Sequence, residues 1–244
     1  MPLRLRHDKA IDAQEREPPG ASARRADQGL VLEGVSKNWV DQRRTALHEV
    51  GLVVGRGSTA AVVGANGSGK TTLLRVIVGM IRPDGGTVSL NGRDSARDGK
   101  RYRSKIGYLS AGNAGLFARL SVGRHLAYSA SIALLSKGDA QRCIDRVLDA
   151  FALRDLASRR VDRLSLGQRQ RVRTALAFLH EPELVLLDEP HNSLDEHGVR
   201  LLREAVGDLT ARGGIALWCA PAVSDLDASF DRSFVMRAGH LERS

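Results

Sequence analysis

Two things are scarce in this chain of 244 residues, and each scarcity excludes a class of protein. Cysteine occurs only as Cys143 and Cys219, far apart and without a Cys-x-x-Cys pair, so neither a disulfide framework nor a zinc site is expected. No apolar run reaches the roughly 18 residues that a membrane-spanning helix needs. The first twenty residues carry scattered charges and no apolar core, which argues against a secretory signal. We expect a cytosolic protein.

Acidic residues are also in short supply. The chain has 28 Asp and Glu against 37 Lys and Arg, a net charge of +9, and only six of the basic residues are lysine. Such a balance suits a nucleic acid, an anionic membrane surface or a nucleotide as partner. It does not choose among them, and a GC-rich genome explains an arginine-rich, alanine-rich composition equally well.

The pattern of apolar residues predicts one large α/β domain. Residues 1–28 mix both signs of charge with Pro18, Pro19 and Gly20, which predicts a flexible N-terminal tail. From Leu30 onward, strand-like and helix-like segments alternate, a pattern typical of a mostly parallel sheet. Residues 121–158 have helical spacing and no strand signal. We therefore predict a domain over 29–244 with a helical subdomain inserted at about 112–163.

The strongest motif is GANGSGKT, Gly64–Thr71, which follows an apolar strand and opens a helix. It matches the phosphate-binding pattern GxxxxGK[ST], in which glycines let backbone N–H groups turn toward a polyphosphate. Lys70 is expected on the β and γ phosphates of ATP, and the Thr71 hydroxyl on Mg²⁺. A glycine-rich turn that binds nothing is the alternative, which the flanking strand and helix disfavour. The predicted phosphate cradle comprises Gly64, Asn66, Gly67, Ser68, Gly69, Lys70, Thr71 and Thr72.

A second motif, LVLLDE at Leu184–Glu189, ends a predicted buried strand. Open α/β sheets bind ligands at the carboxyl ends of their strands, where Asp188 would lie. Asp188 is predicted to hold Mg²⁺, and Glu189 to polarise the attacking water. An apolar run followed by two acids can also be a strand end with solvated carboxylates. Its place about 120 residues after the phosphate loop favours the catalytic interpretation.

The third motif is LSLGQRQR at Leu164–Arg171. With the two motifs above on either side of it, the chain over about residues 30–242 resembles the ATP-binding-cassette (ABC) ATPases. The resemblance implies a P-loop NTPase core with a mostly parallel sheet, an antiparallel β subdomain and an inserted helical subdomain. LSLGQ is similar to the family's signature, which implies that Ser165, Gly167 and Gln168 face the γ-phosphate held by the opposite subunit. Ser165 as an ordinary helix cap is compatible with this role.

Two shorter matches support the resemblance. NSLD at Asn192–Asp195 resembles the loop that joins the two ATP sites of a cassette dimer, which implies a role for Asp195 at that junction. Trp39 lies where the family has an aromatic residue that stacks on adenine, and an indole is well suited to stacking. Plain packing of Trp39 is the alternative.

Two residues depart from the family pattern. Ala111, in IGYLSA, lies where the family has its Q-loop glutamine, and Pro221 lies at the switch histidine, ten residues before Asp231. Neither side chain can hydrogen-bond a γ-phosphate. Both belong to the chain's own ATP site, whereas the signature is intact, so we predict ATP binding with weakened hydrolysis at that site. His191 is a candidate substitute, although we favour a solvated loop side chain.

The resemblance implies the ATP-binding subunit of an ABC transporter. It would bind ATP and Mg²⁺, dimerise with a second ABC ATPase subunit (the same or a different chain), and drive a separate transmembrane subunit from the inner face of the cell membrane. Gly115–Val122, GLFARLSV, resembles the corresponding stretch of exporter cassettes, and the helical insert would carry the cleft for the membrane subunit.

Two other functions stay open. One is an ABC ATPase that acts on ribosomes or nucleic acid, and the other is a regulatory ATP-binding module, which Ala111 and Pro221 favour. The stretch 112–163 carries nine basic and five acidic residues, in the region expected to face the membrane partner. That placement favours polyphosphate and an anionic membrane surface, and makes nucleic acid an unfavoured partner.

Overall fold

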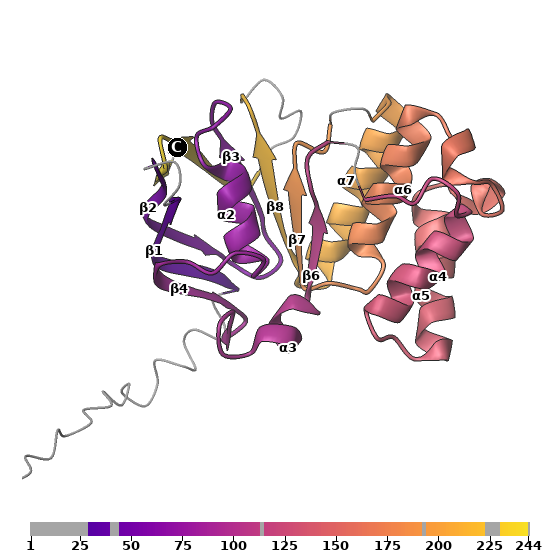
Figure 1. Cartoon of the computed structure of the whole chain (residues 1–244), viewed down its shortest axis with the longest axis horizontal. Coiled ribbons are helices and arrows are strands. Elements are labelled where there is room, and N and C mark those ends of the chain that lie inside the picture. Colours follow the sequence, from indigo (N-terminus) through magenta and orange to yellow (C-terminus); the bar gives the residue numbers. More distant parts are fainter. Residues whose placement is uncertain (1–28, 40–43, 113–114, 192–193, 223–229, 244) are drawn as a thin grey trace, which may run out of the picture.

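A computed structural model describes residues 29–39, 44–112, 115–191, 194–222 and 230–243 (Figure 1). The predicted tail over 1–28 lies outside these residues, as do Asn192 and the residue after it in the NSLD motif. Among the described residues, no helix is both long and apolar enough to cross a membrane.

The centre of the molecule is a six-stranded sheet in the order β10-β9-β3-β8-β7-β6. Its strands from β9 to β6 run parallel, and β10 pairs antiparallel with β9 at one edge. All residues of β7 and β8 are buried, as expected of a parallel sheet covered on both faces. The strand bounds are β3 (Thr59–Val63), β6 (Ile106–Leu109), β7 (Leu184–Asp188), β8 (Ile215–Ala220), β9 (Arg232–Arg237) and β10 (His240–Arg243).

The two faces of this sheet contribute to two different cores. Along β7, Leu184 and Leu186 pack on one face with helix α2 (Lys70–Ile77), because successive side chains of a strand point to opposite sides. Val185 and Leu187 pack on the other face with α6 (Leu166–Phe178) and α7 (Glu196–Ala211). Helix α2 therefore lies on the face opposite to α6 and α7, and its first residue lies at the carboxyl ends of the strands (Figure 1).

A second, antiparallel sheet covers the α2 side, with the strand order β2-β1-β4-β5. Its strands are β1 (Leu30–Trp39), β2 (Arg44–Val54), β4 (Gly85–Leu90) and β5 (Arg93–Asp94). This sheet confirms the predicted antiparallel β subdomain. A short helix that the pattern did not predict, α3 (Gly99–Arg103), follows it, and the buried Tyr102 hydroxyl donates to the carbonyl of Ile77 at 2.5 Å.

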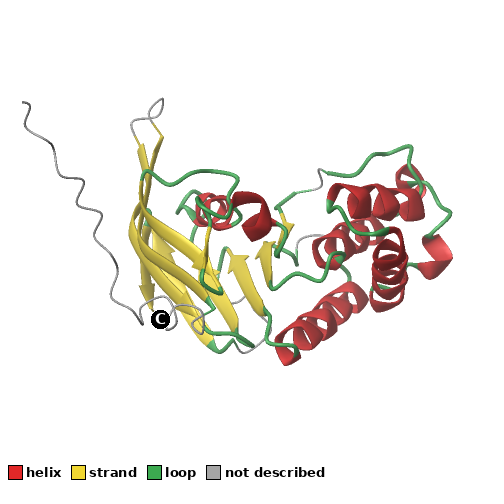
Figure 2. Cartoon of the chain, turned by 90° about the horizontal axis from the view of Figure 1, so that it is seen from below, coloured by secondary structure: helices red, strands yellow, loops and turns green. Residues whose placement is uncertain are grey.

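Regular structure between β6 and α6 is helical in the described residues: α4 (Val122–Ile132), α5 (Lys137–Ala150), and the 3₁₀ turns Arg154–Leu156 and Val161–Arg163. Ser121 and Ser136 cap α4 and α5 by accepting hydrogen bonds from the backbone N–H groups of Arg124 and Asp139. Figure 2 shows these helices gathered at the end of the molecule opposite to the antiparallel sheet. The helical character of this stretch agrees with the prediction, and its boundaries at 112 and 163 stay a prediction.

Candidate nucleotide site

The phosphate loop connects β3 to α2 and depends on glycine at two positions. Gly69, directly before Lys70, has a φ of 116°, a conformation that side chains rarely adopt. A Cβ on Gly69 would lie 2.6 Å from the carbonyl oxygen of Ala46, and a Cβ on Gly64 would lie 2.3 Å from that of Met236. Only glycine lets the loop pass this close to β2 and β9. The backbone is thereby fixed as a turn at the N-terminus of α2.

A cavity of about 440 Å³ lies over this loop, within the size range of small-molecule sites. It contains the predicted stacking residue Trp39, the loop from Asn66 to Thr72, and Glu189. Gly64 lies outside it, in an adjoining hollow beside Val235–Ala238. Trp39 is half-buried at the end of β1, where Lys37 lies over its ring and is held by Asp84 at 2.7 Å. The structure thus places Trp39 and the phosphate loop in one cavity.

Lys70 is nearly fully buried, with 4% of its surface exposed. Its ammonium donates to the carbonyl of Gly64 and, at 3.2 Å, to that of Ala65. Burying a charge is costly unless polar groups hold it, so these two carbonyls keep the ammonium folded over the loop. The lysine is held at the centre of the turn, where the backbone N–H groups would receive a phosphate.

Asp188 lies at the end of β7 beside the start of α2. Its Oδ2 accepts a hydrogen bond from the Thr71 hydroxyl at 3.0 Å, which brings the two predicted Mg²⁺ ligands together. Burial raises the pKa of Asp188, while the Thr71 hydroxyl and the nearby backbone N–H of Ala111 act in the opposite direction. Its Oδ1 is buried and has no hydrogen-bond partner among the described residues.

This donor set suits Mg²⁺. The described residues contain no cluster of three or more His, Cys, Asp or Glu side chains that could hold a metal by themselves. Mg²⁺ in phosphoryl-transfer sites needs only one or two protein oxygens, because phosphate and water complete its shell. A hydroxyl beside a carboxylate with an unpartnered oxygen meets that requirement.

Glu189, the next residue, is held in an unusual backbone conformation. Its φ is 50°, in the left-handed region, and its N–H donates to the carbonyl of Cys219 on β8 at 3.0 Å. Backbone strain of this kind costs on the order of 1–3 kcal/mol and persists where the surroundings enforce it. The side chain borders both the phosphate-loop cavity and a neighbouring one.

The LSLGQ motif begins helix α6 and lies outside the phosphate-loop cavity. Ser165 is the N-cap, and it forms a reciprocal capping box with Gln168: the Gln168 N–H donates to Ser165 Oγ at 3.2 Å, and the Ser165 N–H donates to Gln168 Oε1 at 3.0 Å. Asp195 is the N-cap of α7, and its side chain accepts from the Gly198 N–H at 2.7 Å. Ser165, Gln168 and Asp195 therefore act as helix caps, and none of them lines the chain's own phosphate-loop cavity.

The sequence profile described as "ABC transporter" matches residues 47–192, more than half of the chain. The chain belongs to the ABC transporter family. It is 40% identical over 217 residues to the Fe(3+) ions import ATP-binding protein FbpC 1 of Rhodococcus jostii (strain RHA1), covering 87% of this chain and 60% of that one. It is 32% identical over 216 residues to the daunorubicin resistance ATP-binding protein DrrA3 of Streptomyces coeruleorubidus, covering 88% and 67%.

A solved ATP-binding subunit of an ABC transporter has the same fold, with a TM-score of 0.80, 28% identity, and coverage of 88% of this chain and 89% of that one. The predicted P-loop NTPase fold is confirmed. ATP is therefore the ligand of the family to which this chain belongs, and ATP hydrolysis is the activity of these ABC ATPases.

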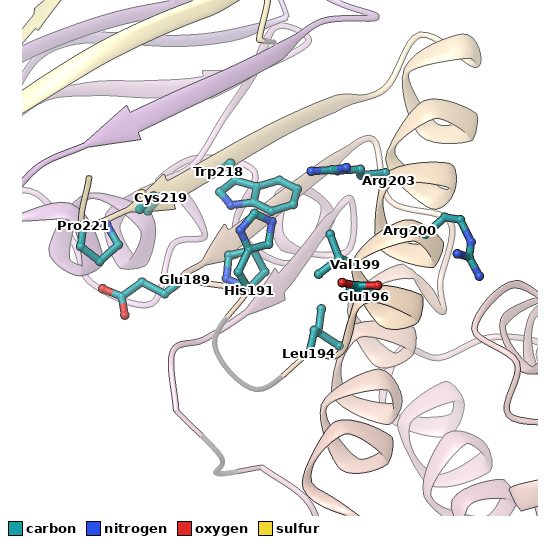
Figure 3. Close-up of a pocket in the computed structure, with 12 residues that line it drawn as sticks. Glu189, His191, Leu194, Glu196, Val199, Arg200, Arg203, Trp218, Cys219 and Pro221 are labelled. Atoms are coloured by element: carbon teal, nitrogen blue, oxygen red, sulfur yellow. The ribbon is translucent and has the colours of Figure 1, made fainter. Parts of the chain in front are cut away.

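Pro221, which the sequence placed at the predicted switch position, follows β8 directly. It lies with Glu189 at one end of a second cavity of about 420 Å³, and the P-loop is close by because the Gly64 N–H donates to the carbonyl of Ala220 at 3.2 Å (Figure 3). The other predicted departure, Ala111, follows β6 next to Asp188. Pro221 thus lines the cavity next to the phosphate-loop cavity, and Ala111 lies beside Asp188.

His191 is not the solvated loop side chain that we favoured from the sequence. It is half-buried, and its ring meets the ring of Trp218 edge-on, with 4.8 Å between centroids and 63° between planes (Figure 3). Trp218 lies on β8, and its ring covers part of the imidazole. His191 lines the second cavity together with Pro221.

Five residues that line the phosphate-loop cavity belong to no motif. Thr45, Ala46 and His48 of β2 line it, together with Ala238 and Gly239 of the turn between β9 and β10. The His48 ring stacks on that of His240, with 4.4 Å between centroids, and the His48 N–H donates to the carbonyl of Gly239 at 2.9 Å. These segments are nearly 200 residues apart in sequence, so no local pattern could have joined them.

Proposed function

We propose that this ABC ATPase is the nucleotide-binding subunit of a transporter. It closes on a second cassette when ATP is bound, drives a separate membrane subunit, and hydrolyses ATP weakly at its own site. One observation carries the proposal: Glu189 lines the phosphate-loop cavity, and Asp188 is hydrogen-bonded to Thr71 of that cavity. Pro221 lines the neighbouring cavity with Glu189, Ala111 lies beside Asp188, and the signature lies outside the phosphate-loop cavity.

In this proposal, different residues bind the phosphates, the base and the metal ion. The backbone N–H groups of the P-loop and the Lys70 ammonium bind the phosphates, and Trp39 supports the base. Thr71 and Asp188 would hold Mg²⁺, which shields the charge of the phosphates when bound. Glu189 orients water and accepts its proton. Ser165, Gly167 and Gln168 serve the nucleotide on the partner cassette, and Asp195 lies at the junction between the sites.

The weakness of hydrolysis follows from two side chains. An alanine methyl group at 111 cannot orient water, and Pro221 has neither a side-chain donor nor a backbone N–H. Removing one preorganised donor at a developing charge costs about 10²–10³ in rate. Binding depends on the P-loop and Lys70 instead, so ATP is held but turned over slowly.

An exposed apolar face on the helical subdomain supports docking of a membrane subunit. Phe117, Tyr128, Ile132 and Leu134 are 47–65% exposed, and Phe117 meets Tyr128 edge-on at 5.6 Å. Tyr128 and Ile132 lie one helical turn apart on α4. Large exposed apolar side chains gathered on one element mark a protein contact more often than single ones do. This face supports a peripheral position on the inner face of the membrane.

Replacing Ile132 with Asp tests this face. Met80 is an ideal comparison, because both side chains are 64% exposed and Met80 lies after α2, outside the helical subdomain. We expect Ile132→Asp to abolish co-purification with the membrane subunit and Met80→Asp to retain it, with ATP binding unchanged in both. Equal retention by the two variants would contradict docking through this face.

The class of function is tested by what co-purifies from the native membrane in detergent. A membrane protein together with a second ABC ATPase subunit supports the proposal. Ribosomes or RNA would instead support the ABC ATPase that acts on nucleic acid, and the chain alone would support a regulatory ATP-binding module.

For the direction of transport we propose export, carried by the likeness of Gly115–Val122 to exporter cassettes. The relatives' names point both ways, since FbpC 1 is named for import and DrrA3 for drug resistance. Growth of a deletion strain on a panel of toxic compounds tests it: restored resistance on re-expression supports export, and restored uptake of a nutrient contradicts it.

A further inference from the structure

Arg173 lies in the middle of α6 and is almost completely buried, with 6% of its surface exposed. Its guanidinium reaches across to the segment that follows β6. Nη2 donates to the carbonyl of Ser110 at 2.7 Å and to its hydroxyl at 3.2 Å, and Nη1 donates to the carbonyl of Gly112. Gln170, one turn earlier on the helix, accepts from Nη1 at 2.8 Å.

Such burial of an arginine is costly and calls for a reason. Burial lowers the pKa of Arg173, yet a guanidinium stays protonated in proteins, so the charge must be held by oriented dipoles. The planar fork suits two acceptors at once, and here these acceptors are carbonyls from the two residues on either side of Ala111. The guanidinium therefore fixes residue 111 from both sides.

Fixing residue 111 matters because β6 pairs parallel with β7, with Leu109 opposite Leu187, so residue 111 follows the strand beside Asp188 and its backbone N–H approaches the Asp188 carboxylate. Asp188 has one oxygen on Thr71 and one without a partner in the described residues. A series of contacts thus runs from Arg173 through the backbone of Ser110–Gly112 to the carboxylate predicted to hold Mg²⁺. The side chain of Ala111 takes no part in it.

We propose that Arg173 is a positioning residue that holds Ser110–Gly112 against Asp188 and so links the signature helix to the chain's own ATP site. Helix α6 itself makes the connection. Ser165, at its start, would face the partner's nucleotide, and Arg173 lies eight residues further along the helix, a distance of about 12 Å along its axis. A shift of α6 on contact with the partner's nucleotide then moves residue 111 relative to Asp188. The part of this inference that concerns the partner's ATP site rests on the proposed function.

Hydrogen exchange of the full chain, followed by mass spectrometry, tests the clamp without relying on activity. We expect Arg173→Ala to raise exchange in the peptide covering 106–112 by at least about tenfold, because the bonds that hold the segment are lost. Arg173→Lys should give an intermediate value, since an ammonium is a point donor and cannot span both carbonyls as the planar fork does. Arg169→Ala, an exposed arginine of the same helix, should leave this peptide unchanged.

Nucleotide titration with a fluorescent ATP analogue provides the second measurement. With Mg²⁺ present, Arg173→Ala should weaken binding several-fold, and in EDTA it should bind as wild type does, because the clamp acts on Asp188 and not on the P-loop. If Arg173→Ala does not fold, Arg173→Lys alone decides. Unchanged exchange at 106–112, or equal weakening with and without Mg²⁺, would overturn the inference. Failure of the wild type to bind the analogue would instead refute the proposed function and leave the exchange result to decide on Arg173.

Discussion

At the scale of single residues, the site divides into groups that bind and groups that are missing. Lys70, Thr71 and Asp188 are buried or half-buried and are held by hydrogen bonds before any ligand arrives. Such preorganisation favours tight binding of phosphates, because little order has to be created when ATP arrives. Ala111 and Pro221, which border the same cluster, offer no side-chain hydrogen bond. The site is therefore better suited to holding ATP than to hydrolysing it.

Restoring the two missing side chains should restore turnover. We expect Pro221→His to raise kcat by about tenfold or more, and the double variant with Ala111→Gln to gain about 10²–10³-fold, since each supplies a polar group near the γ-phosphate. Steady-state ATPase assays check this. Pro221→Ala, which restores a backbone N–H but supplies no side-chain donor, should give a much smaller gain than Pro221→His. A double variant as slow as wild type would show that these positions do not limit hydrolysis.

Two glycines give opposite expectations for the same substitution. Gly69→Ala forces a Cβ against the Ala46 carbonyl at a φ of 116°, so we expect loss of about 1–3 kcal/mol in stability and loss of ATP binding. Gly138, near the start of α5, has open space at its Cβ, and alanine there should be neutral or stabilise by up to about 1 kcal/mol. Thermal unfolding and ATP titration of both variants measure the difference. Equal effects would contradict the argument from the loop geometry.

At the scale of elements, helix α4 is tied to the segment before it by a buried histidine. His125 on α4 is 3% exposed, and its Nε2 accepts a hydrogen bond from the Phe117 N–H at 3.1 Å. The two rings also stack, with 5.5 Å between centroids. An acceptor nitrogen requires the neutral ring, so this tie exists only while His125 is unprotonated.

This tie predicts a dependence on pH. Burial lowers the pKa of His125 in the folded chain below the value of about 6.5 for an exposed histidine. The unfolded chain therefore takes up the proton first, and stability present above pH 6.5 is lost as the pH falls toward the folded pKa. His180 on the turn after α6, whose pKa is also lowered by burial, contributes with the same sign.

His125→Gln isolates the contribution of His125, because the glutamine oxygen can accept from Phe117 and does not titrate. Between pH 8 and pH 5.5 we expect the wild type to lose more stability than His125→Gln, measured by urea unfolding. Parallel losses in the two proteins would assign the pH dependence to His180 and to the other groups instead.

At the scale of the whole molecule, local patterns predicted the fold well and the site in part. Apolar runs and glycines identify β3, α2 and β7, since each is defined by residues adjacent in sequence, and Asp188 and Lys70 follow from them. Trp39 was placed by resemblance. His48, Gly239 and Arg173 could not be found in this way, because their contacts join β2 to the β9–β10 turn and α6 to the end of β6. Long-range packing, which no short motif records, brings them together.

Part of the net charge of +9 can also be assigned to one region of the molecule. The helical stretch 112–163 carries nine of the basic residues. Several of them form salt bridges with nearby carboxylates, as Arg154 does with Asp145 and Asp149. Exposed pairs of this kind contribute little stability. The nine basic and five acidic residues of this stretch give it +4 of the net +9, on the same subdomain as the apolar face of Phe117 and Tyr128. This combination suits a partner at an anionic membrane surface.

The central claim is that this chain holds ATP and hydrolyses it weakly at its own site. The most direct measurement is the ATPase rate of the purified wild-type chain beside Glu189→Gln, with bound ATP counted in both. We predict stoichiometric ATP binding, a rate about 10²-fold or more below that of a cassette with both missing side chains present, and a small further loss in Glu189→Gln. An ordinary cassette rate that falls steeply in Glu189→Gln would contradict the account.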